Sequence, residues 1–472
     1  SLIVMFAALS MIRCGDFLDV QQYVKDMQQY DSIFVRENTT KQWLWEVYSS
    51  LSSTPSLSNG ALYFASDEAI YNDANASCEL YQNGQYSSTN PVWEDRYNAM
   101  YVGIRTASIF IHNVHRCLEV SSAERERMEG EARFLRAFAQ LYLMKHYAFF
   151  WDLDSKYGPL MRRVPGTLSN NNMERSGVRE AYNLILEDLE HAKARGAHVY
   201  AEVVGKDVFS ASRGLAKGFK VEVLLLRGTD EDYAKVPELA NEVLSNYEFK
   251  LEESFENVFK NGYKSTEIMF SRFLSAKKLA DVDMNVASIK KLMCGKYKPN
   301  DQFLDIFNST NDTRYALTFD SVLYEQFNST NKTLILKKLW RTDGNCPMFY
   351  MRLAQMKLFQ AEALEHNGAS VADVLAPLND LRQRSGNVLL KAEDFSDRDD
   401  LVRIIFYEIV REIGLENGAE WFAVRMRLSS GKRLISELNP VYSDDKQLAW
   451  QIPDDEVSYN TLMEPNPVFI RE

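Results

Sequence analysis

Two long stretches of the chain are rich in the residue types that bind ligands through flat apolar faces and polar tips. Residues 52–92 contain NGALYFASDEAIYNDANASCELYQNGQYSSTNP, and residues 251–345 contain FNSTNDTRYALTF and FNSTNKTLILKKLW. Loops longer than about 15 residues in a compact protein are usually functional or disordered, and these hold too many Tyr and Phe to be simply disordered. Tyr combines an aromatic face with a hydroxyl group that forms hydrogen bonds. The composition of both stretches therefore predicts a binding surface.

The sequence lacks the common motifs of catalysis. It contains no GxSxG, HExxH, P-loop or dinucleotide-binding fingerprint. His112 and His115 lie close to Cys117 and could share a metal ion, but no motif places a third ligand, so a surface or packing role is favoured. Two carboxylates could form a glycosidase site, but 66 acidic residues produce such pairs by coincidence. We therefore expect no enzymatic activity, no cofactor and no metal site.

The elements that must position these loops are helices. Apolar and small residues recur at steps of three and four in residues 122–150, 351–367 and 400–418. Further helices are expected at 37–50, 93–119, 178–195, 213–227, 233–246 and 371–385. Several of them form pairs joined by short polar turns, as in repeats of the tetratricopeptide (TPR) kind, whose period is about 34 residues. The pattern predicts a mainly α fold, a TPR-like solenoid of helical hairpins with long irregular loops and a few short β-hairpins.

The charge and cysteine content exclude several classes of protein. The chain has 54 basic and 66 acidic residues among 472, which gives a net charge of −12. Binding to nucleic acid draws on clustered Lys and Arg, so we expect no nucleic-acid partner. Cys78, Cys117, Cys294 and Cys346 show no CxxC or zinc-ligand spacing, and buried thiols are favoured over disulfides.

The N-terminal stretch SLIVMFAALSMIRCGDFLDV allows two interpretations. Leu2–Leu9 is an unbroken apolar run, too short for a membrane span of about 20 residues but suited to the core of a secretory signal. No basic residue precedes it, and a cysteine takes the place of an Ala-x-Ala cleavage site. The stretch is either a lipoprotein signal cut before Cys14 or an ordinary N-terminal helix.

Seven segments spread over nearly the whole chain carry a recognisable pattern: CGDFLDV, VWEDRYNAMYVGIRTASIFIHNV, GEARFLRAFAQLYLMKHYAFF, RLAQMKLFQAEALEHNG, LNDLRQRSG, REIGLENGAEWFAVRMR and WQIPDDEVSYNTLMEPNP. Taken in this order, they resemble the SusD/RagB family, the surface glycan-binding lipoproteins of Bacteroides-type bacteria. Two departures stand out. Arg13 precedes the cysteine where a small residue is usual, and residues 420–424 read EWFAV where the family has Arg-Trp-Phe-Asp-Leu.

The resemblance implies a domain organisation and a function. It implies a signal remnant at residues 1–13, a tether at 14–36 that starts at a lipidated Cys14, and a single SusD-like domain at 37–472 with halves 37–250 and 251–472. Acyl chains on Cys14 would anchor the protein to the outer membrane at the cell surface of a Gram-negative bacterium. The protein would be a non-enzymatic lid on a SusC-like TonB-dependent transporter, to which it passes captured oligosaccharides.

The resemblance also implies where the ligand binds, since family sites draw on the loop after a Ser-Asp-Glu step and on mid-chain loops. The corresponding residues are Asp67, Tyr71, Asn72, Tyr81, Tyr86, Tyr297, Tyr324 and Trp340. Their aromatic faces would stack on sugar rings while polar groups bond the hydroxyls. Trp93 and Trp421 lie on expected helices and are assigned to packing.

Three alternatives remain open at this point. Some resembling proteins serve peptide importers, so peptide capture for a RagA-type transporter is the second interpretation. The Tyr-rich loops favour glycan, because extended peptides need backbone partners and complementary charge. A surface glycoside hydrolase and a scaffold that binds only proteins are the third and fourth. The sequence leaves the glycan itself undetermined.

Overall fold

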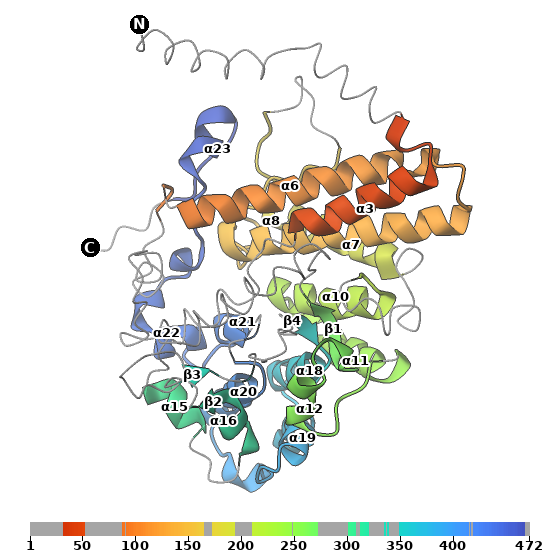
Figure 1. Cartoon of the computed structure of the whole chain (residues 1–472). Helices are drawn as coiled ribbons and strands as arrows, with labels where there is room; N and C mark the ends of the chain where they lie inside the picture. The colour runs from red at the N-terminus through yellow and green to blue at the C-terminus, as the bar shows by residue number, and fades with distance from the viewer. Residues whose placement is uncertain are drawn as a thin grey trace, which may run out of the picture.

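Helices that pack against their neighbours along the chain make up most of the computed structural model (Figure 1). The structure describes residues 32–51, 87–89, 91–164, 172–193, 210–247, 249–271, 301–307, 312–320, 335–336, 338, 349–414, 416 and 419–467. The prediction of a mainly α, TPR-like fold is confirmed.

The first layer contains α3 (Glu37–Leu51), α6 (Pro91–Asn113), α7 (Ser122–Tyr147) and α8 (Val178–His191). Helix α7 packs against the other three (Figure 1), and its C-terminal half is buried on almost every side. This position explains why apolar residues lie on several faces of this half and why its buried Arg136 and Lys145 are ion-paired, with Asp188 and Glu222.

The second layer continues through α10 (Arg213–Arg227), α11 (Asp230–Asn246), α18 (Ala354–His366), α19 (Val371–Arg384) and α20 (Arg398–Ile413). Helix α10 packs on α8 and α11, α11 packs on α18, and α18 packs on both α19 and α20. Each helix is thus covered by the next, which is the arrangement of a helical-repeat solenoid.

Short elements complete the described chain. They are η2 (Val114–Arg116), α12 (Phe255–Lys260), η4 (Gly262–Lys264), β1 (Ile268–Ser271), α15 (Asp301–Phe307), α16 (Thr313–Thr318), β2 (Phe319–Asp320), β3 (Ile335–Leu336), β4 (Phe349–Arg352), η6 (Ala392–Asp394), α21 (Ala419–Arg425), α22 (Leu434–Leu438), η7 (Pro440–Tyr442), η8 (Asp445–Leu448) and α23 (Asp454–Tyr459). None of the helices within the described ranges has the length and apolar composition needed to cross a membrane.

Local sequence sets where the main helices begin. A side-chain oxygen caps the first turn of α7, α10, α11, α19 and α20 by accepting a hydrogen bond from a backbone N–H. The capping residues are Ser121, Ser212, Thr229, Ser370 and Asp397. Such caps are worth about 1 kcal/mol each, so the starts of these helices are fixed by polar residues rather than by the apolar pattern.

A proline inside α11 connects this helix to α18. Pro237 has no N–H, so it cannot donate to the carbonyl of Tyr233 one turn earlier. That carbonyl instead accepts a hydrogen bond from Asn367 Nδ2 at 2.9 Å, while Gln360 Nε2 donates to the Pro237 carbonyl at 3.2 Å. The proline thus leaves the Tyr233 carbonyl without a partner inside α11, and Asn367 at the end of α18 donates a hydrogen bond to it.

The strand β4 corrects the predicted helix at 351–367. Its residues Phe349–Arg352 pair antiparallel with β1, and the helix begins only at Ala354. All four residues of each strand are buried, so the strands lack the alternation that marks a half-exposed strand. The pairing joins segments far apart in the chain, so it is not one of the short β-hairpins that we predicted.

The predicted helix at 400–418 ends early. Helix α20 stops at Ile413, and Gly414 leaves the helical conformation with φ −53° and ψ 133°. A Cβ atom at Gly414 would lie 2.3 Å from the carbonyl oxygen of Val410. Only glycine fits this turn, which directs Glu416 into the interior.

The interior holds a group of ionised residues, which we call the buried charge cluster. Its members are Glu267, Asp312, Arg314, Arg352, Arg384, Glu408, Glu412 and Glu416. Arg352 Nη1 lies 2.9 Å from Glu412 Oε1, and Arg314 Nη2 lies 2.7 Å from Asp312 Oδ2. The cluster joins β1, β4, α19 and α20 with the residues around Gly414.

The C-terminal segment 445–467 returns to the first layer of helices, where α23 lies near one end of α6 (Figure 1). The indole of Trp450 is fully buried against Trp93, His146 and Tyr147. Asn466 Nδ2 donates to the Tyr147 carbonyl at 3.0 Å. The segment resembling the family's Ile-Pro…Asn-Pro ending therefore holds the two ends of the fold together.

Candidate functional site

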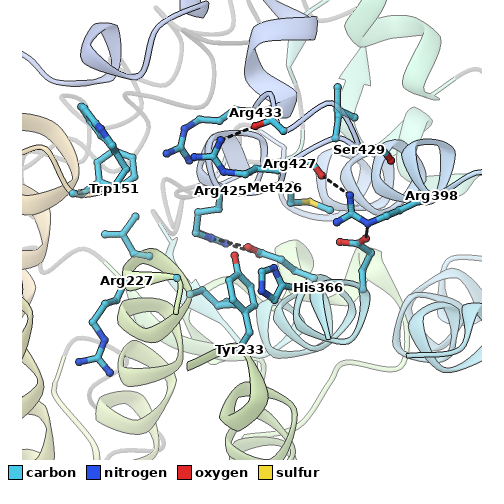
Figure 2. A pocket seen from close by; sticks show the side chains of 18 residues that line it. Trp151, Arg227, Tyr233, His366, Arg398, Arg425, Met426, Arg427, Ser429 and Arg433 are labelled. Carbon is cyan, nitrogen blue, oxygen red and sulfur yellow. Dashed lines mark hydrogen bonds and ion pairs between the residues drawn. The ribbon is translucent and has the colours of Figure 1, made fainter. Parts of the chain in front are cut away.

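A pocket of about 380 Å³ lies where the end of α10 meets α11, α18, α20, α21 and the loop 426–431 (Figure 2). Its volume falls within the range of about 300–1,000 Å³ that is usual for small-ligand sites. The hairpin of α10 and α11, the helix α18, the first residue of α20 and the loop after α21 thus surround the pocket.

Arg425, at the end of α21, forms the floor of the pocket and is buried. Its Nε and Nη2 atoms lie 2.8 and 2.7 Å from the two carboxylate oxygens of Glu362. The guanidinium also stacks over Phe422 at 4.7 Å and Phe359 at 5.7 Å. Burial opposes its charge, but the neighbouring Glu362 outweighs burial and raises the pKa of Arg425. Arg425 is therefore a permanently charged group on an apolar base.

Arg398 and Arg427 form an exposed rim opposite this floor (Figure 2). Arg398 Nε lies 2.6 Å from Glu365, and its Nη1 donates to the Arg427 carbonyl at 3.1 Å. Arg427 Nη1 donates to the Gly431 carbonyl at 2.7 Å, whereas its closest carboxylate, Asp445, is 3.5 Å away. Burial and the nearby Arg433 lower the pKa of Arg427.

Aromatic side chains line two further sides of the pocket. The ring of His366 stacks on Tyr233, with centroids 3.7 Å apart and planes 13° apart. Trp151 lies across the pocket from this pair (Figure 2). Arg227, on the same side, is held by Asp232 through its Nε at 2.7 Å and its Nη2 at 2.5 Å. An apolar ring surface therefore faces a cationic rim.

This arrangement is suited to binding rather than to bond cleavage. A retaining glycosidase needs one carboxylate as nucleophile and a second as acid. Both oxygens of Glu362 accept hydrogen bonds from Arg425, so this carboxylate is occupied, and Glu365 is ion-paired with Arg398. Burial raises the pKa of Glu365, and the described residues that line the pocket offer no second carboxylate free of an ion pair to act as the nucleophile.

All the predicted ligand-binding residues lie outside the residues that the structure describes. They are Asp67, Tyr71, Asn72, Tyr81, Tyr86, Tyr297, Tyr324 and Trp340, and the predicted lipidation site Cys14 lies outside as well. These assignments therefore stay predictions. Trp93 and Trp421, which we assigned to packing, are buried in the core.

The sequence reasoning did not identify the pocket. Arg425 and Arg427 fall in the stretch EWFAVRMR, which we treated only as a family motif. The available signal was the group of arginines at 425, 427 and 433, because a core-facing helix rarely carries cations unless they are paired. Arg227 and Arg398 come from distant parts of the chain, and only the fold brings them to the same pocket.

The fold defines a helical-repeat protein, and the pocket is its candidate site for a small ligand. Two family profiles match the sequence: "Starch-binding associating with outer membrane" (SusD-like) over residues 16–207, and "SusD family" (SusD/RagB) over residues 330–469. The chain belongs to the SusD/RagB family. Membership supports a nutrient-binding role in association with the outer membrane.

Solved structures agree with this fold over almost the whole chain. A SusD superfamily protein from Bacteroides thetaiotaomicron is 18% identical with a TM-score of 0.73, and the match covers 92% of this chain and 100% of that one. One from Bacteroides fragilis is 20% identical with a TM-score of 0.71 and the same coverage. One from Parabacteroides distasonis is 17% identical with a TM-score of 0.72, covering 92% and 99%. At these identities the likeness concerns the fold, and no curated protein matches the sequence.

Proposed function

We propose that the protein captures oligosaccharides at the cell surface and passes them to a SusC-type TonB-dependent transporter without cleaving them. The observation that carries this proposal is family membership in both parts of the chain, at residues 16–207 and 330–469. The first family is described by starch binding in association with the outer membrane, which supports glycan as the ligand and the membrane as the location.

The composition of the long loops supports glycan over peptide. Tyr71, Tyr81 and Tyr86 lie within one stretch that also holds Asp67 and Asn72. Aromatic faces stack on the C–H faces of sugar rings, and the polar groups between them bond the hydroxyls. A capture protein needs only modest affinity, since a ligand held too tightly would not pass to the transporter.

The double substitution Tyr71→Ala and Tyr81→Ala is expected to abolish retention in affinity gels cast with the polysaccharide that retards the wild-type protein. Each aromatic contact is worth about 0.5–1.5 kcal/mol, so loss of both should weaken binding by about tenfold or more. Circular dichroism should show unchanged helix content, because neither substitution changes a residue of the helices that the structure describes.

Tyr459→Ala is the matched control, since Tyr459 is 78% exposed on α23 and lies outside the predicted site. It should leave retention unchanged. Equal retention of the double variant and the wild type would refute the loop site. Binding of peptides in the absence of any glycan binding would replace the proposed ligand class.

Cys14 is expected to anchor the mature chain. Cys14→Ala should move the protein from the membrane fraction to the soluble fraction, because several acyl chains on one cysteine give a stable anchor that a single chain does not. Mass spectrometry of the wild-type N-terminus should find a lipid-modified Cys14, and Cys78→Ala serves as control. An unmodified Cys14 inside the mature chain would contradict this assignment.

A further inference from the structure

We propose that the pocket between α10, α11, α18, α20 and α21 is a second binding site, which recognises a carboxylate group on a ligand of one or two sugar or amino-acid units. None of the residues that line the pocket belongs to the Tyr-rich stretches 52–92 and 251–345, and the inference goes beyond the proposed function without depending on it. Arg425 and Arg427 are the residues that would contact the carboxylate.

The charges at the pocket surface are mainly positive. The side chains that line the pocket include five arginines but only two glutamates, Glu362 and Glu365. The arginines are Arg227, Arg398, Arg425, Arg427 and Arg433. Asp232 and Asp445, which pair with Arg227 and Arg433, do not line the pocket. Part of the charge that compensates these arginines is therefore carried by residues outside the pocket lining.

Three of these arginines have unused hydrogen-bond donors. Within the described chain, one nitrogen of each has no hydrogen-bond partner: Nη1 of Arg425, Nε of Arg427 and Nη2 of Arg398. A guanidinium carries five N–H donors in a fixed fork that matches a carboxylate. Arg425 and Arg427 are separated by one residue in the sequence, and both line the pocket.

The surroundings strengthen such an interaction. The side chain of Arg425 is 3% exposed, whereas that of Arg427 at the rim is 48% exposed. A ligand that enters past the solvent-exposed Arg427 would therefore meet a desolvated Arg425 at the floor of the pocket. Charge-assisted hydrogen bonds are stronger in such a low-dielectric site. Arg433 disfavours the charge of Arg427, and a ligand carboxylate would offset this repulsion.

The charge balance selects a carboxylate over a dianionic phosphate. Glu362, Glu365, Asp232 and Asp445 already compensate most of the positive charge. A singly charged group therefore suits the remaining donors. The pocket volume of about 380 Å³ accommodates one or two sugar or amino-acid units, and Trp151 with Tyr233 offers apolar surface for the part of the ligand beyond the carboxylate.

Isothermal titration calorimetry with purified full-length protein tests this inference. The probes are digalacturonate, its neutral counterpart digalactose, and the dipeptide Ala-Glu. At least one of the two acidic probes should bind about tenfold more tightly than digalactose. Only the acidic probes carry a carboxylate that can accept charge-assisted hydrogen bonds from the spare guanidinium donors. Arg427→Gln should reduce that acidic binding by about tenfold.

Arg403→Gln is the matched control, since Arg403 is also ion-paired on α20 but lies outside the pocket lining. It should leave the affinity unchanged. A preference for digalacturonate identifies an acidic saccharide as the source of the carboxylate, and a preference for Ala-Glu identifies a peptide. Equal affinity for acidic and neutral probes, no binding of either acidic probe, or an unchanged affinity in Arg427→Gln would overturn the inference.

The outcome is distinguishable from a failure of the proposed function. Retention on neutral polysaccharide gels tests glycan binding by the Tyr-rich stretches, and Arg427→Gln is expected to leave this retention unchanged. Arg398→Gln provides a second rim variant should Arg427→Gln prove unstable, and its thermal unfolding is compared with that of the wild type before titration.

Discussion

Replacing Glu412 with glutamine is expected to lower the free energy of unfolding by about 3–5 kcal/mol, the usual cost of removing one partner from a buried ion pair. Glutamine has nearly the same shape as glutamate, so the loss of stability measures the effect of removing the negative charge. Chemical denaturation at neutral pH, monitored by circular dichroism, measures it as a lower midpoint with an unchanged m-value.

The size of this effect follows from the position of Glu412 in the buried charge cluster. Its carboxylate contacts Arg314, Arg352 and Arg384, and both Glu412 and Arg352 are inaccessible to solvent. Without the charge of Glu412, three guanidinium groups remain in the interior with less compensation. Desolvated charges of this kind are costly unless they are paired.

The same carboxylate gives stability a dependence on acidic pH. Burial opposes its ionised form, but Arg384, Arg352 and Arg314 outweigh burial and lower the pKa of Glu412 from 4.5 to about 2. Because the folded pKa is the lower one, this contribution is fully present above pH 4.5 and is lost as the pH falls towards 2. The difference in stability between the wild type and Glu412→Gln should therefore shrink over this range.

Glu437→Gln is the matched control on the neighbouring surface. Glu437 pairs with Arg403 of α20 at 2.7 Å, but its side chain is 40% exposed, so its loss should cost about 1 kcal/mol or less. If the two substitutions lowered the free energy of unfolding equally, burial of the charge cluster would not determine how much the cluster contributes to stability.

The helices were predictable because each depends on a short stretch of sequence. The apolar pattern gives α3, α10 and α19 within a few residues of the predicted bounds. The error at β4 arises because a distant segment decides the conformation, since β4 is a strand only through its pairing with β1. The error at α20 is local, because Gly414 leaves the helical conformation directly after Ile413.

The pocket was not predictable for a related reason. Arg425 and Glu362 lie 63 residues apart in the chain and are brought together only when α21 packs beside α18. The group of arginines at 425, 427 and 433 is visible in the sequence, but nothing there identifies Glu362 as the partner of Arg425. A site made of long-range pairs needs the fold before its chemistry can be recognised.

Trp450→Ala is expected to release the C-terminal segment from the first helical layer and to destabilise the protein by about 3–5 kcal/mol, as large aromatic truncations in cores do. The Trp450 ring centroid lies 4.4 Å from His146, 5.2 Å from Tyr147 and 5.7 Å from Trp93. Its backbone N–H also donates to the His146 carbonyl at 2.6 Å. One side chain therefore joins residues from both ends of the fold.

Hydrogen exchange distinguishes this local release from general destabilisation. In Trp450→Ala, residues 445–467 and the end of α7 should lose protection first, because Asn466 bonds to the carbonyls of both Tyr147 and Trp450, while α18 and α19 should keep theirs under native conditions. Trp45→Ala is the control, since that indole is 47% exposed on α3 and its loss should cost much less. If exchange rose equally in all helices, the C-terminal segment would be an inseparable part of one cooperative unit, and its role as a separate connection between the ends of the fold would be wrong.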